Sequence, residues 1–343
     1  CDGVTLHLAD GVAANQEVFH LHLHVIPRFA GDGFGLKFPP TYANKPGRPE
    51  LDQAATAIRD ALETAPNQES LRAAIVPCMP YPELPSILRE LVAGVEKELA
   101  ANLVGVYLVG SLATGDFDLD SDVDFLVVTK GELSNEAVRS LQAMHARIHS
   151  LGCYPAQHLE GSYISLALLN RPEAVGVQSL WYLNNGSTTL ERSVHDNQWH
   201  VRWILRERGV RLIGPDPKTL LEPVPVEAMR AETATAMRRV VDEFAAEIDL
   251  PLAFWNSRFG QSFAVLNACR MLHTFQAGAI QSKLAGVKWA RHALEPAWGG
   301  LIERAWHERE GVRHCIKIRE RADAHALKET LEFLRYAVRK CER

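Results

Sequence analysis

Long apolar runs are missing from this sequence of 343 residues: no stretch approaches the roughly 18 uninterrupted apolar residues that a transmembrane helix requires. The start of the chain also lacks the basic segment followed by an apolar segment that marks a secretory signal. Both absences argue against a membrane partner and against export. We therefore predict a cytoplasmic protein.

Closely spaced cysteines are missing too, because the six thiols are scattered and include no CxxC pair. Structural zinc sites and small disulfide scaffolds are built from cysteines at short spacing. The pattern instead predicts reduced thiols in the cytoplasm. The cysteines are Cys1, Cys78, Cys153, Cys269, Cys315 and Cys341.

An excess of positive charge is absent as well. Lysine and arginine total 37 against 42 aspartates and glutamates, which gives a formal net charge of -5. Proteins that bind nucleic acid through its phosphates need a basic surface, so we expect no nucleic-acid partner. Hydrophobic residues at 47% and charged residues at 23% are ordinary globular usage, and the length allows about two to three domains.

Proline marks the main break in the chain. Pro77, Pro80, Pro82 and Pro85 lie within nine residues, and so dense a run cannot continue a helix. We predict a linker there. The predicted divisions are a partial module over 1–64, the linker over 65–85, a sheet-containing domain over 86–220 and a helical domain over 221–343.

Hydrophobic periodicity predicts the elements of the larger part. Apolar residues at helical spacing indicate helices, and short apolar runs indicate buried strands. The predicted elements are helices over 86–101 and 136–150, strands over 103–109, 122–128 and 161–169, a turn region over 209–217, and helices from about 226 onward. We expect an α+β fold with a mixed sheet and flanking helices, followed by an all-α domain.

The most informative stretch joins a glycine-serine turn to a pair of aspartates. Gly110 and Ser111 close one apolar strand, and Asp122 and Asp124 open the next. Side chains on a strand alternate between faces, so the two carboxylates project to one side. Paired carboxylates suit Mg²⁺, which completes its octahedron with substrate phosphates. Gly110 lets the backbone approach a phosphate, and Ser111 offers a hydroxyl and an amide to it.

This arrangement of Gly110-Ser111 followed by Ser121-Asp122-Val123-Asp124 resembles the signature of the DNA polymerase β-like nucleotidyltransferases. The resemblance implies that Asp122 and Asp124 are catalytic and hold Mg²⁺, with Gly110, Ser111 and Ser121 near the nucleotide. It also implies a third carboxylate on a neighbouring strand. The candidate is Glu160, as the base that takes the proton from the attacking hydroxyl.

Later segments resemble the streptomycin/spectinomycin adenylyltransferases, a resemblance that covers about residues 79–343. They include 209–217, 221–225, Arg270 and Lys283. The resemblance implies a nucleotidyltransferase domain before a helical domain, with ATP as co-substrate. Arg270 and Lys283 then lie at the nucleotide and supply the positive charge that phosphoryl chemistry needs.

The acceptor implied by the resemblance is a small hydroxylated molecule, and its site should be acidic with aromatic walls. Each candidate also has an ordinary interpretation, as a core tryptophan or a solvated helix face. The candidates are Trp181, Trp199, Trp203, Glu191, Asp196, Asp242 and Glu243. The sequence does not identify the acceptor or the oligomeric state.

Three histidines alternate with apolar residues within a strand predicted over 18–26. His20, His22 and His24 therefore share one face, a geometry that zinc could use. The string also resembles the motif of the histidine triad (HIT) family, with a helix over 50–62 continuing the resemblance to about residue 64. That family attacks the α-phosphate of nucleotides through the middle histidine, here His22.

Residues 1–64 are too few for a whole histidine triad domain, so we expect a partial HIT-type α+β module. The first residue is Cys1 rather than Met, which we interpret as a cut within a longer parent chain.

Three functions follow in order of preference. The first is ATP- and Mg²⁺-dependent transfer of AMP to a hydroxyl of a small molecule, such as an aminoglycoside. The second is a nucleotide hydrolase that uses His22 as nucleophile. The third is a sensor or interaction protein that binds Mg-nucleotide without turnover.

Overall fold

The computed structural model describes residues 3–8, 23–29, 31–32, 80–119, 121–250, 253–309 and 320–342. Two compact units divide the chain, Cys1–Glu69 and Ser70–Arg343. None of the helices within the described ranges is long and apolar enough to cross a membrane.

The first unit contains an antiparallel hairpin of β1 (Gly3–Leu8) and β2 (Leu23–Arg28). Arg28, at the end of β2, donates a hydrogen bond to Thr5 Oγ1 at 3.0 Å and pairs with Asp32 at 2.5 Å. The strand predicted over 18–26 is therefore observed from Leu23 onward. The rest of that prediction and the helix predicted over 50–62 lie outside the described residues.

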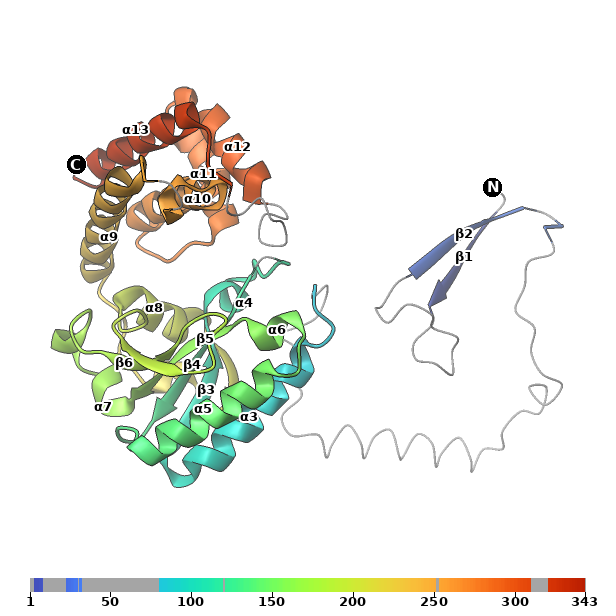
Figure 1. The fold of residues 1–343 in the computed structure, drawn as a ribbon, viewed down its shortest axis with the longest axis vertical. Coiled ribbons are helices and arrows are strands. Elements are labelled where there is room, and N and C mark those ends of the chain that lie inside the picture. Colours follow the sequence, from blue (N-terminus) through green and yellow to red (C-terminus); the bar gives the residue numbers. More distant parts are fainter. Residues whose placement is uncertain are drawn as a thin grey trace. The chain divides into compact units, whose positions relative to one another are not determined.

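The second unit is built on a six-stranded mixed sheet in the order β7-β6-β5-β4-β3-β8 (Figure 1). Strands β4 and β5 run parallel, and the other neighbouring pairs are antiparallel. The strands are β3 (Leu103–Leu108), β4 (Val123–Thr129), β5 (Leu159–Ser165), β6 (Leu180–Leu183), β7 (Leu190–Ser193) and β8 (Val210–Ile213). This mixed sheet with flanking helices confirms the predicted fold class.

Helices cover both faces of the sheet. Val123, Phe125 and Val127 of β4 pack in a core with α3 and α5, whereas Leu126 and Val128 pack in a second core with α8. The helices are α3 (Leu84–Leu99), α4 (Gly110–Thr114), α5 (Asn135–His149), α6 (Tyr154–Gln157), α7 (Leu166–Leu169) and α8 (Trp199–Arg208). Burial on both faces explains why β4 reads as a continuous apolar run after Asp124.

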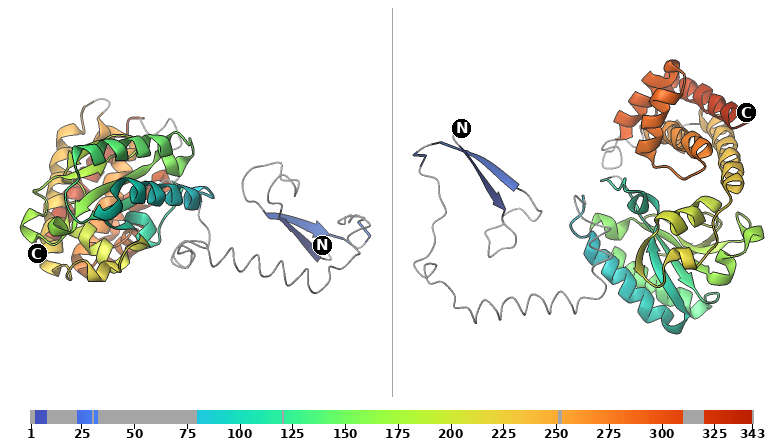
Figure 2. Two further views of the ribbon diagram at one scale, coloured as in Figure 1. Left: turned by 90° about the horizontal axis from the view of Figure 1, so that it is seen from below. Right: turned by 180° about the vertical axis from the view of Figure 1, so that it is seen from behind.

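The C-terminal part is helical, as predicted, and α10 packs against the other four long helices (Figures 1 and 2). Its core is built around Phe244, Trp255, Leu301 and Phe333, all of them buried. The helices are α9 (Val226–Glu247), α10 (Arg258–Ala277), α11 (Lys283–Ala293), α12 (Gly299–Arg309) and α13 (Ala324–Cys341). Short 3₁₀ turns join the elements at η3 (Ala100–Asn102), η4 (Pro172–Ala174), η5 (Pro217–Thr219), η6 (Phe254–Asn256) and η7 (Pro296–Trp298).

Three predicted elements need correction. Helix α3 begins at Leu84, so Pro85 opens a helix in its first turn, where a missing N–H is tolerated, and does not end a linker. The strand predicted over 161–169 ends at Ser165. The hydroxyl of Ser165 accepts a hydrogen bond from Leu168 N at 3.3 Å and so caps the start of α7. The turn predicted over 209–217 contains β8, because Val210–Ile213 pairs with β3 and forms an edge strand of the sheet.

Candidate active site

Three carboxylates gather at one edge of the sheet. Asp124 of β4 lies directly opposite Glu160 of β5 in the parallel register, and Asp122 lies two residues earlier, just before β4 begins. Neighbouring strands in register place such side chains on the same face. The structure therefore brings together the residues that the sequence selected as metal ligands and base.

Burial and mutual repulsion both raise the pKa values of carboxylates in this cluster. Burial raises the pKa of Asp124 well above its usual range, and the negative charges of Glu160, Asp122 and Asp196 raise it further. Burial also raises the pKa of Glu160, and Asp122 adds to that effect. A group of carboxylates that disfavour one another's charge is stabilised by a cation placed among them.

The turn after β3 fits tightly against this cluster. Gly110 has φ of 58°, and a Cβ there would lie 1.9 Å from Asp124 Oδ2, so no side chain is tolerated. Ser111 Oγ is buried and has no hydrogen-bond partner among the described residues. Ser121 is used differently, since its buried hydroxyl donates to Asp118 Oδ1 at 2.6 Å within the loop before β4.

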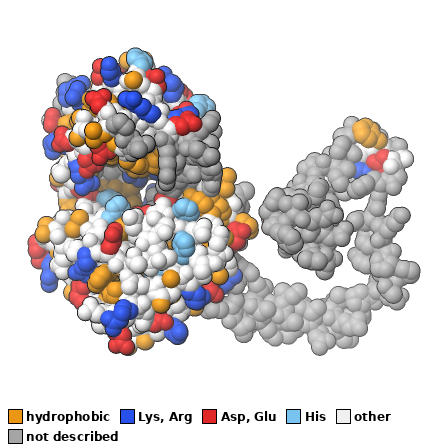
Figure 3. Space-filling model, viewed as in Figure 1, with side chains coloured by type: hydrophobic (Ala, Val, Ile, Leu, Met, Phe, Trp, Pro, Cys, Tyr) orange, Lys and Arg blue, Asp and Glu red, His pale blue; other side chains and the backbone are white. Residues whose placement is uncertain are grey.

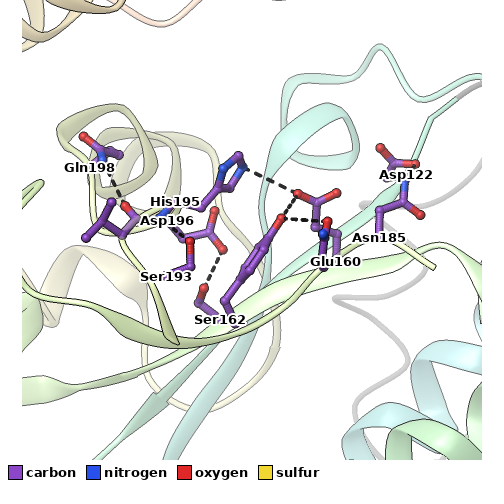
Figure 4. A network of polar contacts seen from close by, with 11 residues as sticks. Asp122, Glu160, Ser162, Asn185, Ser193, His195, Asp196 and Gln198 are labelled. Atoms are coloured by element: carbon purple, nitrogen blue, oxygen red, sulfur yellow. Dashed lines mark hydrogen bonds and ion pairs between the residues drawn. The ribbon is translucent and has the colours of Figure 1, made fainter. Parts of the chain in front are cut away.

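A network around Glu160 was not predicted from the sequence. Tyr182 of β6 donates its hydroxyl proton to Glu160 Oε1 at 2.5 Å, and His195 Nε2 lies 3.5 Å from the same oxygen. Figure 4 shows His195 pointing toward Glu160 from the segment after β7. Both contacts lower the pKa of Glu160 and so oppose the effect of burial. They hold the carboxylate in one orientation, although burial still leaves the pKa of Glu160 raised overall.

Asp122 is held by a second chain of hydrogen bonds. Asn185 Nδ2 donates to Asp122 Oδ1 at 2.6 Å (Figure 4). His158 Nδ1 lies 2.8 Å from Asn185 Oδ1. An amide that donates through nitrogen must accept through oxygen, so the network assigns the His158 proton to Nδ1. Asn185 and His158 thus orient one oxygen of Asp122.

Asp196 is the one acceptor candidate that the structure places beside the base. It accepts a hydrogen bond from Ser162 Oγ at 2.7 Å, and burial raises its pKa. The other candidates lie elsewhere: Trp181 packs beneath Arg192, Trp203 joins the core under α8, Trp199 lines a groove with α9, and Glu191, Asp242 and Glu243 are exposed.

The helical region supplies positive charge to the carboxylates. Lys283, at the start of α11, lowers the pKa of Asp124, and its ammonium lies 5.3 Å from the ring centre of Phe263. Arg270 of α10 interacts with Asp124 and donates to Asn267 Oδ1 at 2.6 Å. Burial lowers the pKa of Arg270. Both predicted cations therefore interact electrostatically with Asp124 of the carboxylate cluster.

Of the three N-terminal histidines, His24 alone lies within the described residues. His24 lies in β2 opposite His7 of β1. His20 and His22 lie outside the described residues, so the role of His22 stays a prediction.

Two family models match the second unit in succession. A nucleotidyltransferase domain model matches residues 88–159, which carry Gly110, Asp122 and Asp124. A model of the aminoglycoside adenylyltransferase C-terminal domain matches residues 219–336. The second unit therefore carries a nucleotidyltransferase domain, followed by a region that matches the aminoglycoside adenylyltransferase C-terminal domain.

Curated relatives of this nucleotidyltransferase are spectinomycin 9-adenylyltransferases. That of Campylobacter jejuni is 22% identical over 230 residues, which cover 65% of this chain and 84% of the relative. That of Staphylococcus aureus is 26% identical over 225 residues, covering 62% and 79%. A solved spectinomycin adenyltransferase from Enterococcus faecialis, with ATP and spectinomycin, has a TM-score of 0.55 at 16% identity and covers 76% of this chain and 99% of its own. That likeness concerns the fold.

The N-terminus matches a different family. A HIT domain model matches residues 1–31. An uncharacterized HIT-like protein of Borreliella burgdorferi is 60% identical over 35 residues, which are 10% of this chain and 25% of that protein. The resemblance to the histidine triad family is therefore confirmed for a short segment.

Proposed function

We propose that this nucleotidyltransferase transfers AMP from ATP to a hydroxyl of an aminoglycoside-class antibiotic such as streptomycin or spectinomycin. The observation that carries the proposal is the placement of Asp122, Asp124 and Glu160 at one sheet edge, against the Gly110 turn. The activities of the relatives support the adenylyl group as the one transferred.

The residues present fit Mg²⁺. No group of three or more His, Cys, Asp or Glu in the described part of the chain could hold a metal by itself. Mg²⁺ is commonly held by one or two carboxylates and completed by water and substrate phosphates. Burial raises the pKa of Asp124, and the negative charges of Glu160 and Asp122 raise it further; a cation among these carboxylates would offset that charge. Asp122 and Asp124 would hold the ion, which would neutralise charge on the phosphates.

Each remaining group has a task in the transfer. Glu160 takes the proton of the acceptor hydroxyl. The oxygen of that hydroxyl attacks the α-phosphate, and pyrophosphate leaves. Tyr182 and His195 orient Glu160 for that step and lower its pKa against the effect of burial. The Ser111 hydroxyl, which has no hydrogen-bond partner in the described part of the chain, and the cations Arg270 and Lys283 suit the phosphates.

Asp196 supports a cationic acceptor. Its carboxylate lies close enough to Asp124 and Glu160 to raise the pKa of both. An ammonium group on the acceptor would offset this charge beside the base, at the point where the attacking hydroxyl must lie.

The test is incubation of the purified protein with ATP, Mg²⁺ and a panel of aminoglycosides that includes streptomycin and spectinomycin. We expect one acceptor to gain the mass of one adenylyl group while pyrophosphate is released, and Asp124→Ala to form no product. Tight ATP binding without product from any acceptor would overturn the proposal and favour a nucleotide sensor.

The match of residues 1–31 to the HIT model supports a second candidate, nucleotide hydrolysis by His22. We expect any hydrolysis of nucleoside phosphoramidates to be lost in His22→Ala. Hydrolysis that persists in this variant would count against the triad.

A further inference from the structure

Arg309, at the end of α12, forms an ion pair with the loop that precedes β4. Its Nη2 atom donates to Asp118 Oδ2 at 2.5 Å, and only 17% of the Arg309 side chain is exposed. The contact joins residues 191 positions apart and connects the helical region to the sheet. A guanidinium this shielded from water interacts strongly with whichever anion it contacts.

The loop that Arg309 contacts leads directly to the metal-binding carboxylates. Asp118 Oδ1 accepts from Ser121 Oγ at 2.6 Å, and Ser121 Oγ accepts from Asp118 N at 3.0 Å. Ser121 immediately precedes Asp122. Among the described residues, Ser121 thus contacts one oxygen of the Asp118 carboxylate and Arg309 contacts the other.

Arg309 also belongs to the group of cations that faces the carboxylates. It lines a small cavity with Lys283, Phe259 and Phe263. Its positive charge lowers the pKa of Arg270, which in turn interacts with Asp124. Three cations of the helical region thus lie around the position where the nucleotide phosphates would meet Asp124.

Resting on the function proposed above, we propose that Arg309 is a further phosphate-binding residue for ATP and that Asp118 competes with the phosphates for it. An arginine side chain forms paired hydrogen bonds to a phosphate as readily as to a carboxylate. The triphosphate carries more negative charge than Asp118, so the nucleotide draws Arg309 away. The loop keeps its Ser121 contact when this happens.

A purely structural role for the Arg309–Asp118 ion pair leads to a different expectation. If the pair only holds the two regions together, loss of either partner weakens nucleotide binding. If Asp118 competes for Arg309, the two losses have opposite effects. Asp118→Asn is the suitable change, because the amide oxygen still accepts from Ser121 while the amide nitrogen cannot accept from Arg309.

The experiment measures the Kd of α,β-methylene ATP with Mg²⁺ by calorimetry, without any acceptor. We expect R309Q to weaken binding about tenfold and D118N to tighten it about threefold, the scale of one charge-assisted hydrogen bond. In the double variant the gain from D118N should disappear, because it depends on Arg309. The matched control is R304Q, which removes another α12 arginine, paired with Glu329, and should leave Kd unchanged.

The outcomes separate this proposal from the proposed function. Weakened binding in both single variants overturns competition and favours a structural pair. A D118N gain that survives in the double variant also overturns it, since Asp118 then acts on the nucleotide without Arg309. Failure of the wild-type protein to adenylylate any acceptor, with these Kd changes intact, would instead overturn the function alone.

Discussion

At the scale of single residues, Gly110 has the least freedom in the site. Its positive φ favours glycine, and the space that a Cβ would need is filled by the Asp124 carboxylate. Gly115, five residues later, also has a positive φ of 82°, but nothing lies within 4 Å of its Cβ position. Substitutions at Gly110 and Gly115 therefore distinguish the effect of backbone strain from the effect of a steric clash.

We predict that Gly110→Ala lowers adenylyl transfer at least about 100-fold, because the methyl group displaces Asp124. Gly115→Ala should cost about 1 kcal/mol of stability through strain alone. Turnover and urea unfolding of both variants check this. Equal loss of turnover in the two variants would show that strain, not the Asp124 contact, explains the effect.

Glu160→Gln should lower the rate of transfer by about 10²-fold to 10⁴-fold, the usual range for loss of a general base. ATP-analogue binding should stay near that of the wild type. Loss of nucleotide binding in this variant would indicate that Glu160 acts first as a metal ligand.

Tyr182→Phe should move the acidic limb of the kcat/KM profile. The Tyr182 hydrogen bond lowers the pKa of Glu160, so its removal raises that pKa. The base works ionised, and activity should therefore fall at a higher pH on acidification than in the wild type. A pH–rate profile measures the limb; a shift to lower pH would contradict the assignment of Glu160 as base.

At the scale of elements, α8 is joined to α9 through Glu232. This carboxylate accepts hydrogen bonds from Trp199 N at 2.6 Å and His200 N at 3.1 Å, the free amides at the start of α8. His200 Nδ1 also lies 2.7 Å from it. Burial alone would raise the pKa of Glu232, but His200 and the two amides outweigh burial and lower it.

Glu232→Gln should lose about 1 kcal/mol of stability at neutral pH, the usual effect of a lost helix cap. Because the folded pKa of Glu232 lies below its unfolded value, its contribution is present above the unfolded pKa and is lost as pH falls through the folded pKa. Urea unfolding at several pH values should show the two proteins converging on acidification. A difference that grows in acid would contradict this.

At the scale of the whole molecule, the carboxylates come from the sheet and the cations come from the helices. The surface facing the viewer in Figure 3 carries both signs of charge over both regions, so the local grouping, not the net charge, marks the site. A nucleotide held between Asp124 and Lys283 would contact both regions at once.

Mg²⁺ with an ATP analogue at about 100 times its Kd should therefore stabilise the fold by ~2.7 kcal/mol. Chelation of the metal should remove most of this gain, as should Asp124→Asn. Thermal unfolding with and without EDTA checks it. Equal stabilisation by the nucleotide without metal would contradict the assignment of Asp122 and Asp124.

Sequence alone determined the motif residues and the fold class. Gly110, Asp122 and Asp124 lie within 15 residues, on one turn and at the start of one strand, so strand alternation and turn chemistry are enough to place them together. Glu160 followed from the family resemblance.

Only the tertiary structure decided the partners of these groups. Tyr182, Asn185 and His195 reach the site because β6 and β7 pair beyond β5, and Arg309 reaches Asp118 because α12 packs in the helical region. The short strands β6, β7 and β8 have weak local sequence patterns. Their positions depend on pairing with neighbouring strands of the sheet. Contacts between segments distant in sequence depend on that packing, which local spacing does not encode.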